Sequence, residues 1–155
     1  MRIVFMGTPD FAVPSLEILV ENGYDVVVVI TATDKLGGRC GKKLIESAVK
    51  KFAQEKGIPV LQPKNLKNPD FQSELRALQS DLQVGVAFRM LPVAVWDMPP
   101  IGPSHLHGSL LPAYRGAAPI NWAVINGEKE TGVTTFFLKH EIDTGDVLFQ
   151  ESMPI

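Results

Sequence analysis

The sequence predicts an α/β fold built on a mostly parallel, twisted sheet with helices on both faces. Residues 2–6 (RIVFM), 24–30 (YDVVVVI) and 82–88 (LQVGVAF) are short runs rich in β-branched and aromatic residues. Continuous apolar runs of this length are typical of parallel strands that are buried on both faces. Segments with helical spacing separate them, and such alternation is the pattern of an α/β sheet.

The first half of the chain follows this alternation. Residues 10–21 have apolar side chains at helical spacing and end at Asn22-Gly23, so strand, helix and strand follow one another in a right-handed crossover. Residues 46–56 predict a second helix that Gly57 ends, and residues 59–61 a brief strand. Asn68-Pro69 predicts the start of a third helix.

The C-terminal part predicts an antiparallel extension. Residues 101–107 favour a strand, although Pro103 excludes a regular central ladder at that point. Residues 117–126 favour a helix that Gly127 ends, and residues 131–138 and 146–150 favour two paired strands. No internal repeat or linker is visible, so we expect one domain over residues 1–155.

Composition excludes several classes of protein. The formal net charge is −2 and 21% of residues are charged, so a nucleic-acid contact would need a local basic patch. Cys40 is the only cysteine, which excludes an internal disulfide and favours a reducing compartment. We find neither a signal peptide nor an apolar run near the ~20 residues of a membrane span. We therefore expect a cytoplasmic protein.

Ligands of such sheets bind at the carboxyl ends of the strands. That rule predicts that residues 7–10, 31–34 and 89–91 share one edge. Residues 90–92 there either line an apolar pocket or belong to the core. The turn after the first strand lacks G-x-G-x-x-G, which argues against an NAD enzyme.

Two histidines mark a candidate site. His105 and His107 are two positions apart, so on a strand they project from the same face. His140 and Asp143 lie between the last two strands, and a histidine–carboxylate pair suits proton transfer near neutral pH. Two alternatives stay open: ordinary strand-end histidines, or an H-x-H metal site that lacks an evident fourth ligand.

The residues after His107 have ordinary structural interpretations too. Ser109 lacks the G-x-S-x-G elbow of a nucleophile, so its hydroxyl is expected to cap a turn or bind backbone. Residues 110–112 are expected to pack and stiffen the loop. Tyr114 and Arg115 offer either a polar handle for a ligand or plain surface.

A glycine-rich basic loop spans residues 34–43. It fails the Walker A pattern, because no Gly-Lys-Ser/Thr stands at the required spacing. Cations among glycines suit contact with a phosphate backbone. The alternative is a solvated loop.

These motifs together resemble the methionyl-tRNA formyltransferase family. The resemblance rests on MRIVFMGTPDFAVPSL, DKLGGRCGKKLIESAVK, LQVGVAFRMLP, HLHGSLLPAYRGAAPINWAVINGEKETGVTTFFL and EIDTGDVL, and it runs through the whole chain. The H-x-S-L-L-P stretch is shared with other 10-formyltetrahydrofolate-dependent formyltransferases. The basic loop and RGAAPINWAVINGE point to the tRNA-directed branch.

The resemblance implies a Rossmann-like formyltransferase fold and transfer of a formyl group from 10-formyltetrahydrofolate to the amino group of initiator methionyl-tRNA, with no metal. The family's catalytic residues are Asn, His and Asp; its His and Asp correspond to His107 and Asp143. His105 stands at the Asn position, where the family uses a neutral donor to the oxyanion. Loss of such a donor typically costs ~10²–10³ in rate.

The resemblance also implies binding residues. The folate is expected to lie against Phe88, Arg89, Met90, Leu91, His140, Glu141 and Ile142. The tRNA is expected to contact Arg39, Lys42, Lys43, Ser109, Leu110, Leu111 and Pro112.

The sequence is shorter than the family pattern. The family's catalytic domain continues past residue 155 and is followed by a barrel-like tRNA-binding domain, so we expect an incomplete catalytic domain, monomeric, with weak or absent turnover. Two other functions stay open: formylation of a small amine such as a ribonucleotide or amino sugar, and a non-catalytic remnant that binds folate or metal.

Overall fold

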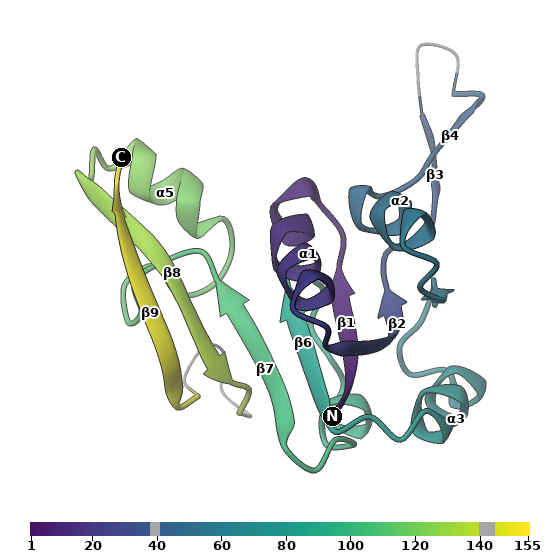
Figure 1. Ribbon diagram of the computed structural model, residues 1–155. Coiled ribbons are helices and arrows are strands. Elements are labelled where there is room, and N and C mark those ends of the chain that lie inside the picture. Colours follow the sequence, from purple (N-terminus) through teal and green to yellow (C-terminus); the bar gives the residue numbers. More distant parts are fainter. Residues whose placement is uncertain (38–40, 140–144) are drawn as a thin grey trace. The chain divides into compact units, whose positions relative to one another are not determined.

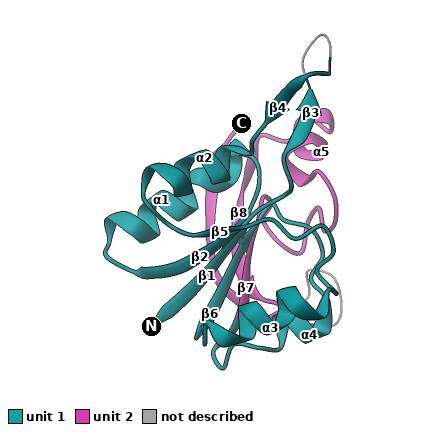
Figure 2. Cartoon of the chain, turned by 90° about the vertical axis from the view of Figure 1, so that its right-hand side faces the viewer, with its two compact units in different colours: residues 1–102 teal, residues 103–155 magenta. Residues whose placement is uncertain are grey.

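The computed structural model describes residues 1–37, 41–139 and 145–155. The chain forms two compact units, residues 1–102 and 103–155, shown in separate colours in Figure 2. Among the described residues, no helix has both the length and the apolar character that a membrane crossing requires.

A parallel sheet forms the centre of the first unit. Its strands are β1 (Arg2–Gly7), β2 (Asp25–Ile30), β5 (Val60–Leu61) and β6 (Leu82–Val86), in the spatial order β5-β2-β1-β6. Each neighbouring pair in that order is parallel. Strands were predicted at all four places, three of them from apolar runs, so the α/β class is confirmed.

Helices cover both faces of this sheet. Figure 2 shows α1 (Val13–Glu21) and α2 (Ala48–Glu55) on one side, and α3 (Pro69–Ala77) and α4 (Val93–Trp96) on the other. A 3-10 turn, η1 (Asp10–Ala12), leads into α1. Side chains alternate across a strand; Val4 and Met6 therefore share a buried cluster with Phe71, Leu75 and Val95 from the α3–α4 side. Ile3 and Phe5, also buried, face the opposite side.

Local capping explains where two of the helices begin. The Ser47 hydroxyl accepts a hydrogen bond from the Lys50 amide at 3.0 Å, at the start of α2. Asn68 accepts from the Asp70 amide at 2.8 Å, and Pro69 occupies the first turn of α3. Both arrangements satisfy amides that have no partner within the helix. The predicted start at Asn68-Pro69 is confirmed.

The basic segment differs from its prediction as a loop. Residues Lys35–Gly37 (β3) and Lys43–Ile45 (β4) pair as an antiparallel hairpin. Lysine and glycine have low strand propensity, and each strand is only three residues long, so no sequence pattern signalled it. The short helix α4 was also missed, because it lies among prolines.

The second unit is antiparallel. Strands β7 (Gly102–His107), β8 (Glu130–Phe137) and β9 (Val147–Pro154) lie in that order, and α5 (Pro119–Ile125) connects β7 to β8 (Figure 1). The antiparallel strands expected near the C-terminus are confirmed. Pro103 lies within β7, where its carbonyl accepts from the Leu138 amide at 2.9 Å. Proline lacks an amide but keeps this acceptor.

Candidate active site

The turns after β1, β2 and β6 lie at one edge of the parallel sheet. Met6 pairs with Ile30, and Gly7 with Val86, so the three strands end together, as predicted. Gly7 is needed there, because a Cβ at this position would lie 2.8 Å from the Ala12 Cβ. The first turn can thus fold back closely against η1.

The predicted folate residues after β6 have mixed surroundings. Phe88 and Leu91 are partly buried and pack against the core cluster, which fits the alternative of a core role. The Arg89 guanidinium donates to the carbonyls of Pro63 and Lys64. Met90 is 77% exposed. The other predicted folate residues, His140, Glu141 and Ile142, lie outside the described residues, as does Asp143.

His105 and His107 project from the same face of β7, as their spacing predicted. Their ring centroids are 6.4 Å apart. They pair across the ladder with Phe136 and Thr134 of β8, and the His105 ring meets the edge of the Phe136 ring at 5.6 Å. His107 is buried and His105 half-buried. The strand thus presents two imidazoles side by side.

A backbone carbonyl fixes the His107 ring. Its Nε2 lies 2.8 Å from the carbonyl oxygen of Tyr114. A carbonyl oxygen only accepts hydrogen bonds, so Nε2 must carry the proton and donate it. In the neutral ring the lone pair is then on Nδ1. This nitrogen is the one that can take up a proton.

Neutral hydrogen bonds hold the loop between His107 and Tyr114. The Ser109 hydroxyl donates to the Ala113 carbonyl at 2.7 Å, so the structural interpretation of Ser109 is confirmed. Thr134 Oγ1 donates to the Ser109 carbonyl at 2.7 Å and accepts from the Leu111 amide at 3.1 Å. Gln150 Nε2 donates to the Leu111 carbonyl at 3.0 Å and to Thr134 Oγ1 at 2.9 Å. The Leu111–Pro112 peptide bond is cis.

Sequence reasoning missed Thr134 and Gln150. Both lie on strands, where polar residues are ordinary, and nothing in their local sequence marks them as supports of a loop 23–39 residues away in the chain. Their role follows from the register of β7, β8 and β9 alone.

Tyr114 is anchored at both ends. Its carbonyl accepts from His107, and its hydroxyl donates to Glu128 Oε1 at 2.6 Å. Asn126 Nδ2 donates to the same hydroxyl at 3.0 Å. The hydrogen bond to the Glu128 carboxylate raises the pKa of Tyr114 above its ordinary value, because that bond stabilises the protonated phenol. Tyr114 is therefore a structural support of the ring rather than a free handle.

Gly145 directly follows the segment that contains the predicted Asp143, and it lies close against β8. A Cβ at Gly145 would lie 1.4 Å from the Phe137 carbonyl oxygen. The next residue, Asp146, accepts from the Phe137 amide at 3.2 Å. Only glycine allows the chain to pass this close to β8.

Two of the predicted tRNA residues lie on or beside the basic hairpin, whereas Ser109, Leu110, Leu111 and Pro112 lie in the loop after β7. Lys42 and Lys43 are exposed, and Lys43 begins β4. Arg39 lies outside the described residues.

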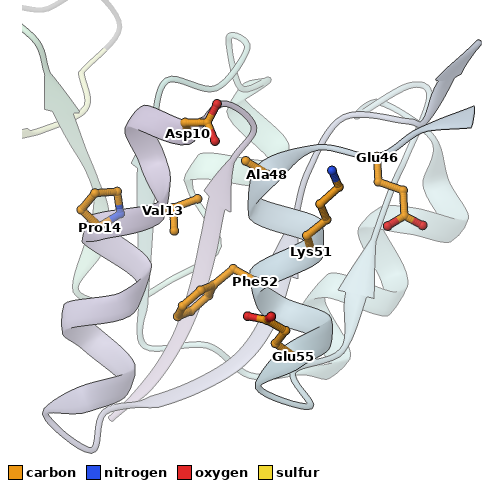
Figure 3. A pocket seen from close by; sticks show the side chains of 8 residues that line it. All are labelled: Asp10, Val13, Pro14, Glu46, Ala48, Lys51, Phe52 and Glu55. Atoms are coloured by element: carbon orange, nitrogen blue, oxygen red, sulfur yellow. The ribbon is translucent and has the colours of Figure 1, made fainter. Parts of the chain in front are cut away.

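A metal cluster or a cavity lined by the predicted site residues would further define the site among the described residues. Within 1–37, 41–139 and 145–155, no three His, Cys, Asp or Glu side chains are close enough to hold a metal ion. An open groove of about 530 Å³ lies between α1 and α2 (Figure 3). Its lining residues are Asp10, Val13, Pro14, Glu46, Ala48, Lys51, Phe52 and Glu55. None of the predicted site residues lines it.

Comparison with known proteins identifies relatives over the whole chain. The chain is 65% identical over 155 residues to a methionyl-tRNA formyltransferase of Parabacteroides distasonis and 57% identical to that of Flavobacterium johnsoniae. All of the chain is covered, but it spans only 48% and 49% of those proteins. The chain thus spans about half the length of the curated relatives it matches.

Solved structures share the fold. A phosphoribosylglycinamide formyltransferase from Bacillus halodurans has a TM-score of 0.80 at 21% identity, covering 100% of this chain and 80% of that one. A formyltetrahydrofolate deformylase from Pseudomonas syringae has a TM-score of 0.75 at 20% identity, covering 99% and 51%. The formyl transferase family model matches residues 1–155. The chain therefore belongs to the formyl transferase family.

Proposed function

We propose that this chain is the N-terminal catalytic part of an enzyme that formylates the amino group of initiator methionyl-tRNA. The observation that carries the proposal is the identity of 65%, over every residue of the chain, to a methionyl-tRNA formyltransferase. The formyl donor is a folate, 10-formyltetrahydrofolate, and the reaction takes place in the cytoplasm. We expect the protein to act as a monomer.

His107 is the proton carrier in this proposal. The bond from the formyl carbon to the folate nitrogen breaks, and a bond from that carbon to the methionine nitrogen forms. The attacking amine must lose a proton, which we assign to Nδ1 of His107, because Nε2 is occupied by the Tyr114 carbonyl. His107 then returns that proton to the departing nitrogen. Asp143 is proposed to stabilise the imidazolium between these two transfers.

His105 is proposed to donate to the developing oxyanion. The edge contact with Phe136 restricts the ring, and its place beside His107 puts it on the reacting face. An imidazole is larger than the carboxamide that the family uses there, and its protonation varies with pH. We therefore propose that His105 performs this role less well than asparagine.

The folate is proposed to bind at the edge formed by the ends of β1, β2 and β6. Exposed Met90 and half-buried Phe88 offer apolar contact for a ring system. Lys42 and Lys43, with Arg39, are proposed to contact the tRNA phosphates, for which exposed flexible cations are suited.

The test compares acceptors in the full-length protein that carries this chain. With 10-formyltetrahydrofolate present, we expect formylation of initiator methionyl-tRNA and none of free ribonucleotide or amino-sugar amines. Formylation of a small amine alone would replace the proposal with the alternative. His105→Asn should raise kcat by about tenfold, since it restores a neutral oxyanion donor. An unchanged or lower kcat would contradict the role given to His105.

A further inference from the structure

A lysine on α2 holds both ends of the basic hairpin. Lys50 Nζ lies 2.6 Å from Asp34 Oδ2 and 3.5 Å from Glu46 Oε1. Asp34 immediately precedes β3, and Glu46 immediately follows β4. One ammonium group therefore joins the two ends of the hairpin. Figure 1 shows β3 and β4 projecting from the rest of the first unit.

Neutral groups reinforce this connection. Gln62 Nε2 donates to Asp34 Oδ1 at 2.7 Å and to the Ala32 carbonyl at 3.0 Å. Thr31 and Ser47 hydroxyls share a hydrogen bond of 2.7 Å, and Ser47 also caps α2. The segments before and after the hairpin are thus tied to one another and to the ends of β2, β5 and α2.

The described residues of the hairpin are mostly exposed. Its two strands pair over three residues each, and Leu36 and Leu44 are 72% and 57% exposed. In contrast, the side chains of Lys50 and Asp34 are only 12% and 16% exposed, so water screens this ion pair less than a surface pair. The direction in which the hairpin projects therefore depends on its base.

We propose that Lys50 is a positioning residue that orients the β3–β4 hairpin, and with it Lys35, Lys42 and Lys43, for binding to tRNA phosphates. This inference rests on the proposed function for its ligand. Lys50 need not touch the tRNA itself. If the hairpin is misdirected, all of its lysines lose their phosphate contacts together. Substitution of one contacting lysine would remove only a single contact.

Charge gives Lys50 a second effect. Without the ammonium, Asp34 and Glu46 would repel each other and would also repel approaching phosphates. The hydrogen bond from Lys50 holds the pKa of Asp34 below its ordinary value and keeps this carboxylate charged. Because Lys50 offsets the charge of these carboxylates, the lysines of the hairpin give this region a net positive charge.

The experiment uses the full-length protein with Lys50→Met, Lys50→Arg and the matched control Lys51→Met. Lys51 is the next residue on α2 and is exposed. We expect Lys50→Met to raise KM for initiator methionyl-tRNA roughly two- to fivefold, with kcat and the folate KM unchanged. Lys50→Arg should restore most of the loss, and Lys51→Met should have less effect.

Hydrogen exchange of the hairpin amides tests the clamp without any tRNA. We expect Lys50→Met to speed exchange in residues 35–37 and 43–45 while α1 and β1 stay protected. If the variant unfolds globally, Asp34→Asn removes the same ion pair with less change in size. Unchanged exchange, or a tRNA KM no higher than that of Lys51→Met, would overturn the inference. Absence of tRNA formylation by the unaltered protein would instead refute the proposed function.

Discussion

The two units hold their loops by different kinds of interaction, ionic in the first unit and neutral in the second. In the first unit, Lys50 holds the base of the β3–β4 hairpin. Its ammonium lies 2.6 Å from the Asp34 carboxylate and 3.5 Å from that of Glu46. In the second unit, the loop after His107 is held by neutral hydrogen bonds from Ser109, Thr134 and Gln150. These bonds position the Tyr114 carbonyl that accepts from the His107 ring, and neutral bonds of this kind depend little on salt. The ion pair of the first unit is the more sensitive of the two arrangements to salt and pH.

The largest expected effect is on His107. His107→Ala should lower kcat by about 10²–10⁴, because it removes both proton transfer and the bond to Tyr114. His107→Gln is the matched control: its amide can still donate to the Tyr114 carbonyl but cannot carry a proton. We expect both variants to lose activity and only the alanine variant to lose stability. Full activity in the glutamine variant would rule out a proton carrier at this position.

The second largest expected effect is on stability, from alanine substitutions of one turn glycine in each unit. Gly145→Ala should destabilise the second unit by about 3 kcal/mol, since its Cβ would overlap the Phe137 carbonyl. Gly41→Ala, in the hairpin turn, should cost only about 1 kcal/mol. Its φ is +62°, but no atom lies within 4 Å of the added Cβ. Chemical denaturation of each variant measures the difference, and equal losses would contradict this reasoning.

Thr134→Val tests the neutral network. It leaves the Ser109 carbonyl, the Leu111 amide and Gln150 without their shared partner, so we expect a loss of about 2 kcal/mol. Thr135→Val is the control, because its hydroxyl makes only a long bond of 3.4 Å to Phe149. Urea unfolding should show less than about 0.5 kcal/mol for the control. A similar loss in both would show that Thr134 has no special role.

The smallest effect is the pH response of the hairpin. The pKa of Asp34 is lowered by its hydrogen bond to Lys50, so the clamp contributes stability above the ordinary carboxyl pKa and loses it as pH falls through the lowered value. The pKa of Lys50 is raised by Asp34, so the upper limit lies above the ordinary lysine value of 10.5. Between these limits we expect no change from the clamp in the NMR spectrum of the hairpin amides, and a transition below about pH 4. The amides of residues 109–111 should not follow that transition.

Much of the fold was predictable because strong local patterns agreed with it. The runs RIVFM and LQVGV are largely buried and form parallel strands, as their apolar patterns predicted, and Asn68-Pro69 carries its own helix-start signal. The β3–β4 hairpin was not predictable, since lysine and glycine have low strand propensity and each strand is only three residues long. For the candidate site, the shared face of His105 and His107 followed from their spacing, whereas Thr134 and Gln150 depend on strand register.

The sequence by itself determined the α/β class, the family and the pair of imidazoles, because alternation and motif are properties of neighbouring residues. Only the tertiary structure decided which nitrogen of His107 can accept a proton, since that depends on a carbonyl seven residues away that a folded loop brings within 2.8 Å. It also decided that Lys50 joins both ends of the hairpin. Such contacts depend on how helix and strand pack, and no local pattern encodes them.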